Sequence, residues 1–213
     1  MIVEQIVVGP LASNCYIFGD EEAGRGIVVD PGADAPLILG AIARLGLEIE
    51  AIVATHGHFD HVGAAGEVRE RTGAPFLAHP QEQEAIAAAR LRAQLFAGLD
   101  IPQPPSPDRL LEEGEVLSIG RYTLRVAHAP GHSPGHIVLL GDNLAFVGDV
   151  LFAGSVGRTD LPGGDYTALM QSISRLLLPL PDETVVYPGH GPVTTIGRER
   201  LTNPFLVGLA EEP

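Results

Sequence analysis

Residues 55–61 read Thr55-His56-Gly57-His58-Phe59-Asp60-His61, and they place three imidazoles and one carboxylate in six consecutive positions. The stretch follows a largely apolar run at residues 50–54, as expected where a buried strand ends. Neutral imidazole and carboxylate are ligands of zinc and of borderline metals such as iron and manganese. Along an extended turn His56 and His58 can point one way while Asp60 and His61 point another. The stretch therefore predicts a metal site, and its spacing favours two ions over one.

Three later segments each place a candidate ligand in a glycine-containing turn that follows an expected strand. Residues 129–136 contain His132, residues 146–149 end in Asp149, and residues 187–191 contain His190. Glycine allows the backbone to bend sharply and to approach an ion. On its own Asp149 would be read as a turn cap. Because all three segments share this pattern, we expect His132, Asp149 and His190 to bind metal together with residues 55–61.

Two further polar residues are candidates for supporting roles. We assign His136 to packing or to the support of a ligand rather than to metal ligation. Asp30 precedes Pro31-Gly32 and can either cap that turn or orient a ligand imidazole. The sequence leaves both roles of Asp30 open.

Composition limits the classes of partner. The 213 residues include 27 acidic and 13 basic side chains, for a formal net charge of −14. Such a surface repels phosphate backbones and anionic lipids, which disfavours nucleic-acid and membrane partners and favours a small-molecule substrate. The single cysteine, Cys15, excludes an intrachain disulfide. No basic N-terminal segment with an apolar stretch and no apolar run of about 20 residues is present, so the cytoplasm is the expected location.

Hydrophobic patterning predicts alternating strands and helices along the chain. Strands are expected at residues 2–8, 15–18, 26–30, 50–55, 76–78, 116–119, 123–127, 137–140, 144–147 and 184–187. Helices are expected at residues 35–45, 62–71 and 166–178 and within 80–99, and a proline-rich connector at 100–107. We expect one domain over residues 1–213, with a helical insertion and its connector at about 80–108. Both halves run from strands to a helix, which suggests an α+β fold, a four-layer αβ/βα sandwich.

The pattern of residues 55–61, followed by an isolated His, an Asp and a His at strand ends, resembles the metallo-β-lactamase superfamily. The resemblance extends from about residue 28 to residue 191. Residues 148–152 (Gly-Asp-Val-Leu-Phe), 157–160 (Gly-Arg-Thr-Asp) and 188–192 (Pro-Gly-His-Gly-Pro) are similar to the hydroxyacylglutathione hydrolase, or glyoxalase II, branch. Residues 201–206 resemble the short, single-domain bacterial members of that branch.

The resemblance implies two divalent metal ions that share one carboxylate. One ion would be held by His56, His58, His132 and Asp149. The other would be held by Asp60, His61, Asp149 and His190, so that Asp149 bridges the pair. Zinc is the expected metal, and iron or manganese fits the same ligands.

The resemblance also implies an activity, the hydrolysis of a thioester by a metal-bridging hydroxide. The expected substrate is S-lactoylglutathione or a similar hydroxyacyl thioester, with Asp60 as the catalytic proton acceptor. Arg158 is the candidate contact for a substrate carboxylate. Longer enzymes of the branch carry a C-terminal helical domain that binds glutathione, and an aromatic residue where this chain has Asp160. The sequence therefore leaves the identity of the thiol open.

Two alternatives remain at this point. The 157–160 segment also resembles persulfide dioxygenases, which would use a single iron on His56, His132 and Asp149. A metal-binding scaffold without catalysis is the third possibility, although no expected ligand is missing. The sequence does not specify the oligomeric state.

Overall fold

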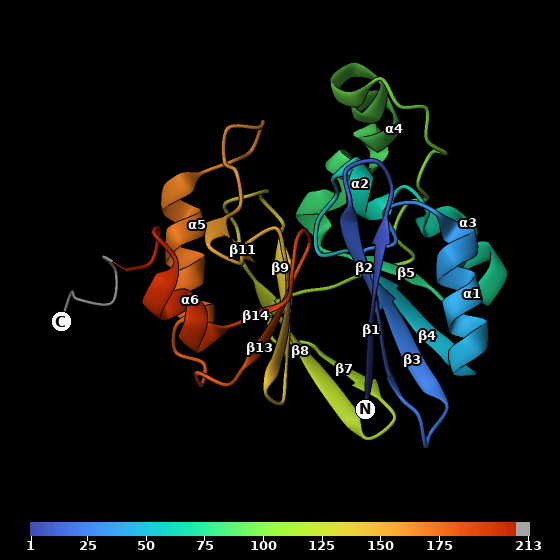
Figure 1. The fold of residues 1–213 in the computed structure, drawn as a ribbon. Coiled ribbons are helices and arrows are strands. Elements are labelled where there is room, and N and C mark those ends of the chain that lie inside the picture. Colours follow the sequence, from blue (N-terminus) through green and yellow to red (C-terminus); the bar gives the residue numbers. More distant parts are fainter. Residues whose placement is uncertain (208–213) are drawn as a thin grey trace.

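The computed structural model describes residues 1–207, and its strands form two six-stranded sheets and one small hairpin. The two large sheets lie face to face, with helices on the outer side of each (Figure 1). Three apolar clusters fill the spaces between these four layers. The expected α+β, four-layer αβ/βα sandwich is confirmed.

The first sheet has the strand order β1-β2-β3-β4-β5-β6. Its strands are β1 (Ile2–Val8), β2 (Ser13–Asp20), β3 (Arg25–Val29), β4 (Glu48–Val53), β5 (Phe76–Ala78) and β6 (Arg109–Leu110). Strands β1 to β3 pair antiparallel, and β3 to β6 pair parallel. Helices α1 (Ala35–Leu45) and α3 (Ala65–Thr72) cover its outer face through a cluster that includes Ile38, Ile52 and Val68.

The second sheet has the order β14-β13-β10-β9-β8-β7. Its strands are β7 (Val116–Ile119), β8 (Tyr122–His128), β9 (Ile137–Gly141), β10 (Leu144–Gly148), β13 (Val185–Pro188) and β14 (Thr194–Thr195). Only β10 and β13 pair parallel. Helix α5 (Tyr166–Ser172), its π-helical continuation Ile173–Leu177 and helix α6 (Ile196–Thr202) supply side chains to the outer cluster.

Alternation along the central strands divides their side chains between layers. On β3, Ile27 and Val29 belong to the cluster between the sheets, whereas Val28 belongs to the outer cluster under α1. This is the two-residue period of a strand that is buried on both faces. Aromatic rings join the sheets, with Phe146 centred 5.4 Å from Tyr16 and 5.8 Å from Phe18. The two sheets therefore hold a fixed relative position, which the site at their common edge requires.

The prediction of one helix at residues 62–71 is wrong in extent. The prediction of an extended turn before that helix is also wrong. The chain forms two helices, α2 (Phe59–Val62) and α3, with a break at residues 63–64. The His61 amide donates to the His58 carbonyl (3.0 Å), so Asp60 and His61 lie on a helical turn. Gly63 packs so closely on the Gly32 carbonyl that a Cβ at residue 63 would overlap it. This tertiary contact explains why residue 63 is a glycine.

Several short elements were not predicted. They are β6, the hairpin of β11 (Leu151–Phe152) and β12 (Ser155–Val156), β14 and α6. A strand of two residues cannot display an alternation, so only its partners define it. Helix α6 carries few apolar residues and begins at Thr195, whose hydroxyl accepts from the Arg198 amide.

The segment at residues 80–108 contains a 3₁₀ turn (Pro80–Glu82) and helix α4 (Gln83–Ala97), followed by an irregular stretch to β6. Figure 1 places α4 above the edge of the first sheet, next to α2. No helix within residues 1–207 has both the length and the apolar character needed to cross a membrane.

At the edge opposite α4, a buried carboxylate connects the two sheets. Asp20, at the end of β2, accepts hydrogen bonds from the backbone amide and the guanidinium of Arg121 in the β7–β8 turn (2.9 Å each). These bonds hold the pKa of Asp20 well below its usual range. Because the folded-state pKa is lowered, the resulting stability is present above the unfolded-state pKa and is lost as the pH falls through the folded-state pKa.

We therefore expect Asp20→Asn to lower the free energy of unfolding near pH 7, and we expect this difference to shrink as the pH falls from about 4 toward about 2. Urea unfolding of both proteins across this range measures the difference. Glu22→Gln is the control, because Glu22 also pairs with Arg121 but is exposed. A difference that does not change with pH would show that Asp20 acts only through packing.

Candidate metal centre

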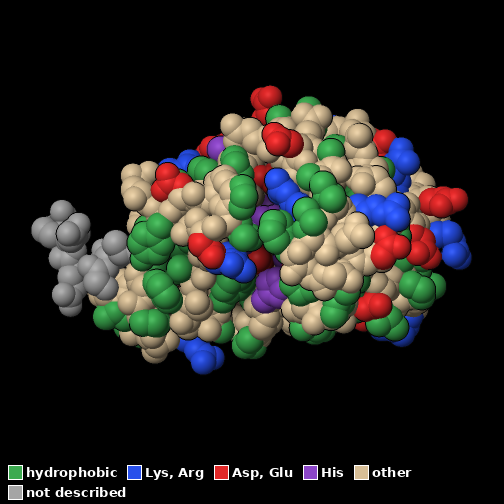
Figure 2. Space-filling view, turned by 90° about the horizontal axis from the view of Figure 1, so that it is seen from above, with side chains coloured by type: hydrophobic (Ala, Val, Ile, Leu, Met, Phe, Trp, Pro, Cys, Tyr) green, Lys and Arg blue, Asp and Glu red, His purple; other side chains and the backbone are tan. Residues whose placement is uncertain are grey.

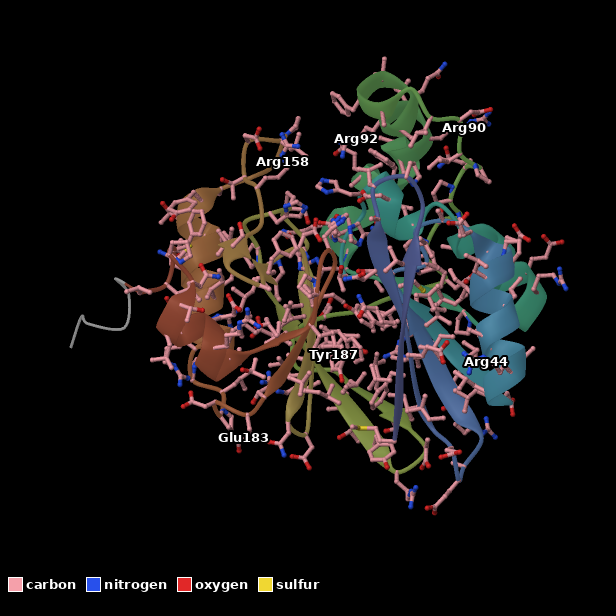
Figure 3. The ribbon with its side chains drawn as sticks, in the orientation of Figure 1. Arg44, Arg90, Arg92, Arg158, Glu183 and Tyr187 are labelled. Atoms are coloured by element: carbon pink, nitrogen blue, oxygen red, sulfur yellow. The ribbon has the colours of Figure 1, made fainter. Side chains whose placement is uncertain are left out.

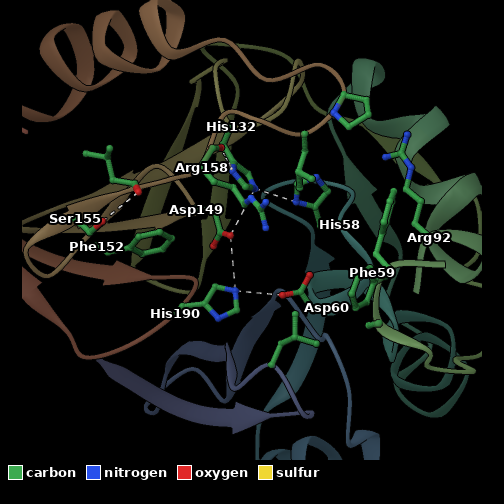
Figure 4. A pocket seen from close by; sticks show the side chains of 16 residues that line it. His58, Phe59, Asp60, Arg92, His132, Asp149, Phe152, Ser155, Arg158 and His190 are labelled. Carbon is green, nitrogen blue, oxygen red and sulfur yellow. Dashed lines mark hydrogen bonds and ion pairs between the residues drawn. The ribbon is translucent and has the colours of Figure 1, made fainter. Parts of the chain in front are cut away.

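The candidate site lies where strand ends from both sheets meet. The segment after β4 approaches the segments after β8, β10 and β13 around a cavity of about 650 Å³. Figure 2 looks onto this edge and shows histidine side chains between the two halves of the molecule, among hydrophobic and basic side chains. The cavity is lined by His58, Asp60, His132, Asp149 and His190, which Figure 4 shows from close by.

Three imidazoles form the first group of candidate ligands. His58 Nδ1 lies 3.1 Å from His56 Nε2 and 2.9 Å from His132 Nε2. Ligand atoms about 2.0–2.1 Å from a tetrahedral ion are roughly 3.3 Å apart, so this spacing fits one ion with little adjustment. The Nδ1 of His132 faces the Arg158 carbonyl at 2.8 Å. Because a carbonyl only accepts, Nδ1 carries the proton and Nε2 keeps its lone pair for the cavity.

Asp60, His61 and His190 form the second group. His190 Nε2 lies 3.2 Å from Asp60 Oδ2 and 3.4 Å from His61 Nε2. His61 Nε2 is 3.5 Å from the same Asp60 oxygen. One ligand atom from each residue thus falls within 4.8 Å of the others.

Asp149 lies between the two groups. Its Oδ1 is 3.5 Å from His61 Nε2, and its Oδ2 is 3.5 Å from His132 Nε2 and 3.7 Å from His190 Nε2. Among residues 1–207, no hydrogen-bond donor reaches the buried Oδ1. A buried carboxylate oxygen without a donor is costly unless a cation neutralises it. Gly189 leaves room for it, since a Cβ there would overlap Oδ1.

The pKa values of the histidines differ between the groups. Burial lowers the pKa of His56 well below its usual value and that of His58 to about 3, so both rings stay neutral, as metal ligation requires. Burial would also lower the pKa of His61, but Asp60, Asp149 and Asp30 outweigh it and raise this pKa to about 10. The same three carboxylates would favour a metal cation beside His61, and the ring must give up its proton to bind one.

Asp30 contacts His61 on the side of the ring that faces away from the other candidate ligands. Its Oδ2 lies 3.1 Å from His61 Nδ1, and it accepts hydrogen bonds from the amide and the hydroxyl of Thr55 (2.7 Å each). The contact to Nδ1 leaves Nε2 of His61 facing Asp60 and Asp149.

His136 is fully buried behind the first group. Its ring stacks on His56, with centroids 4.8 Å apart and planes at 18°, and its Nε2 accepts from the Asp149 amide (3.1 Å). Burial lowers its pKa well below the usual value. It joins neither group of candidate ligands within the described chain, and it contacts the backbone of Asp149 instead.

Glu82 joins the two ligand-bearing segments, and sequence reasoning missed it. Its fully buried carboxylate accepts from the Gly57 amide (2.6 Å) through Oε2, and from the Ser133 hydroxyl (2.8 Å) and the Gly135 amide (2.7 Å) through Oε1. Gly57 lies between His56 and His58, and Ser133 follows His132. Burial raises the pKa of Glu82 despite these donors. In the sequence it stands in Gln-Glu-Gln-Glu, a pattern typical of an exposed helix end.

Residues at the start of β2 were also missed. The Ser13 hydroxyl donates to Asp60 Oδ2 (3.0 Å), and Asn14 Nδ2 donates to the carbonyls of Pro188 (2.8 Å) and Gly191 (2.9 Å). The Asn14 bonds attach the turn that carries His190 to the first sheet, and the Ser13 bond orients Asp60. Two polar residues directly before an apolar strand were the available signal.

The cavity walls are mostly apolar. They consist of Leu11, Phe59, Phe96, Ala97, Phe152, Val156, Leu161 and Pro162. Arg158 also lines the cavity, where its Nε and Nη2 each lie 2.7 Å from a different oxygen of Asp160. This pairing lowers the pKa of Asp160 to about 2.

The structure thus brings the seven expected ligand residues close together at the common edge of two sheets between helical layers, where five of them line one cavity and His56 and His61 are buried behind it. This combination defines the metallo-β-lactamase class, and the chain belongs to the metallo-β-lactamase superfamily, whose family model matches residues 8–190. Membership places the chain among the metallo-hydrolases.

Particular relatives are similar over nearly their whole length. The hydroxyacylglutathione hydrolase GloC of Haemophilus influenzae is 40% identical, over 97% of this chain and 98% of the relative. The crystal structure of the B3 metallo-β-lactamase BLEG-1 is 40% identical, with a TM-score of 0.91, and covers 97% of this chain and 100% of its own. TTHA1623, crystallised in a di-iron-bound form, is 45% identical, with a TM-score of 0.88 over 96% and 100%.

Proposed function

We propose that the protein is a thioester hydrolase with a centre of two divalent metal ions. The observation that carries this proposal is the pair of His/Asp groups, both in contact with Asp149, at the base of one apolar-walled cavity. His56, His58, His132 and Asp149 would hold one ion. Asp60, His61, Asp149 and His190 would hold the other.

The donor set fits such ions. It offers neutral imidazoles, carboxylates and a buried carboxylate oxygen that no donor within residues 1–207 satisfies. Zinc is the expected metal, while iron and manganese suit the same ligands, and the di-iron form of TTHA1623 supports iron as a candidate. Bound ions would lower the pKa of a coordinated water from ~15.7 toward ~7 and neutralise the charge that develops on the substrate carbonyl oxygen.

The chain's own residues contribute proton transfer and substrate positioning. Asp60 lines the cavity, and its Oδ2 is occupied by Ser13 and His190, which leaves Oδ1 to take up a proton. The apolar walls exclude water and accommodate the acyl and thiol portions of a substrate. Arg158 adds a cation to the wall formed by the β12–α5 loop.

The relatives and the site together support one substrate class. The name of the H. influenzae relative specifies a hydroxyacylglutathione, which supports S-lactoylglutathione or a similar hydroxyacyl thioester as the substrate. The similarity to BLEG-1 makes a β-lactam the competing substrate to test. A mononuclear iron dioxygenase on His56, His132 and Asp149 is less well supported, because it would leave the Asp60–His61–His190 group without a role.

The test is to load the purified protein with zinc, iron or manganese, count metal ions per chain and follow hydrolysis of S-lactoylglutathione. We expect two ions per chain, thioester hydrolysis that a chelator abolishes, and recovery on reloading. Two controls use the same preparations. One iron per chain with oxygen uptake on glutathione persulfide would support the dioxygenase, and turnover of a β-lactam alone would support a lactamase. Two bound ions without thioester hydrolysis would reject the proposal.

A further inference from the structure

The 13 basic residues of the chain are all arginines, and most of them already have an acidic partner. Within residues 1–207, the four that form no ion pair are Arg71, Arg92, Arg125 and Arg198. Of these, only Arg92 lines the cavity above the metal centre. A cation without a carboxylate partner at the mouth of a cavity is available to a ligand.

Arg92 lies on α4 across the cavity from Arg158. Figure 3 shows Arg92 on the side of α4 that faces the loop carrying Arg158, and Figure 4 shows it near Phe59, beyond His58. The two arginines differ in availability, because Arg158 is held by both oxygens of Asp160. A ligand anion at Arg158 would compete with Asp160, whereas one at Arg92 meets no such competitor in the described chain.

The surroundings of Arg92 favour an anionic group. The acidic residues that line the cavity are Asp60 and Asp149, and neither forms an ion pair with it. Phe59, Phe96 and Ala97 line the same cavity and add apolar surface to it, which favours a charge-assisted hydrogen bond over competition from water. Because the whole chain carries a net charge of −14, an anionic substrate needs such a local cation. The planar guanidinium fork matches a carboxylate.

We infer that Arg92 binds a carboxylate of the substrate, so that α4 selects anionic over neutral thioesters. This inference rests on the proposed function and assigns its substrate specificity to a residue outside the metal centre. The acyl-thiol linkage would lie over the metal centre, and the carboxylate on the α4 side of the cavity.

The experiment compares Arg92→Gln with Arg90→Gln in the metal-loaded protein. Arg90 is on the same helix, pairs with Asp100 and points away from the cavity (Figure 3). The substrates are S-lactoylglutathione and its dimethyl ester, which keeps the thioester but lacks both carboxylates. We expect Arg92→Gln to raise KM for the free acid about 10-fold or more with little change in kcat. For the diester, Arg92→Gln and the wild type should have the same KM. Arg90→Gln should leave the KM of both substrates unchanged.

Calorimetric binding of S-methylglutathione, which cannot be hydrolysed, gives a second measurement. Arg92→Gln is expected to weaken this binding by a similar factor, and the dimethyl ester of the probe should bind both proteins equally. If binding depends on Arg92 while no thioester is hydrolysed, the proposed function fails and the carboxylate site stands. If the wild type hydrolyses the thioester but Arg92→Gln behaves as Arg90→Gln in both assays, the Arg92 inference is overturned and the proposed function is intact.

Discussion

Replacing Asp149 with asparagine is expected to reduce thioester hydrolysis at least about 1000-fold, or ~4 kcal/mol of transition-state stabilisation. Asp149 is the one carboxylate in contact with histidines of both ligand groups. An amide keeps the size of the side chain but removes its negative charge and one of its two oxygen atoms that could bind metal. We therefore also expect the metal content to fall from two ions per chain toward one. Metal analysis and steady-state kinetics on the same preparation measure both effects.

This variant should still fold. The Asp149 side chain makes no hydrogen bond within the described chain, so folding does not depend on one. Asp142→Asn is the matched control, because it makes the same change at an exposed position in the turn before β10. Asp149, by contrast, lies at the other end of that strand. Circular dichroism verifies that both variants are folded. Retention of two ions and activity within about 10-fold of the wild type by Asp149→Asn would contradict a bridging role.

Replacing Glu82 with alanine is expected to lower the free energy of unfolding by about 3 kcal/mol or more, because three buried donors lose their acceptor. Glu82→Gln should cost less, about 1–2 kcal/mol. Its carbonyl oxygen can replace Oε1 toward Ser133 and Gly135, but its amide then faces the Gly57 amide as a second donor. Denaturant unfolding of the metal-free proteins measures both changes.

A positioning role predicts more than a loss of stability. Since Glu82 holds Gly57 and Ser133, it sets the distance between the His56–His58 pair and His132. Glu82→Gln is therefore expected to weaken metal binding at this first group by roughly 10- to 100-fold. Glu84→Gln makes the same change at an exposed position two residues later, in the first turn of α4, and should alter neither property. A Glu82→Gln protein that binds metal as tightly as Glu84→Gln would leave Glu82 a purely structural residue.

The sequence predicted those parts of the protein that depend on neighbouring residues. Apolar runs bounded by turn residues located the longer strands, such as β1 and β4, and the three-to-four residue spacing located α1. The density of His and Asp at residues 55–61 indicated metal ligands, because few other roles require so many imidazoles together. These patterns involve neighbouring residues only, so they can be recognised without knowledge of the fold.

Other features depended on contacts between distant segments. The need for a glycine at residue 63 follows from its approach to the Gly32 carbonyl, and the two-residue strand β6 is defined only by its pairing with β5. Glu82 and Glu84 look equivalent in the sequence. Only packing buries one and exposes the other.

The sequence by itself determined the superfamily and its set of candidate metal ligands, since residue type and spacing carry that information. Tertiary structure alone decided which arginine lacks a partner, which glutamate joins the ligand segments and which apolar side chains surround the cavity. Charge pairing and burial are set by residues far apart in the chain, as for Arg92 on α4 and Arg158 across the cavity. The physical reason is that electrostatic and packing interactions depend on distance in space. The separation of two residues along the sequence predicts that distance only in part.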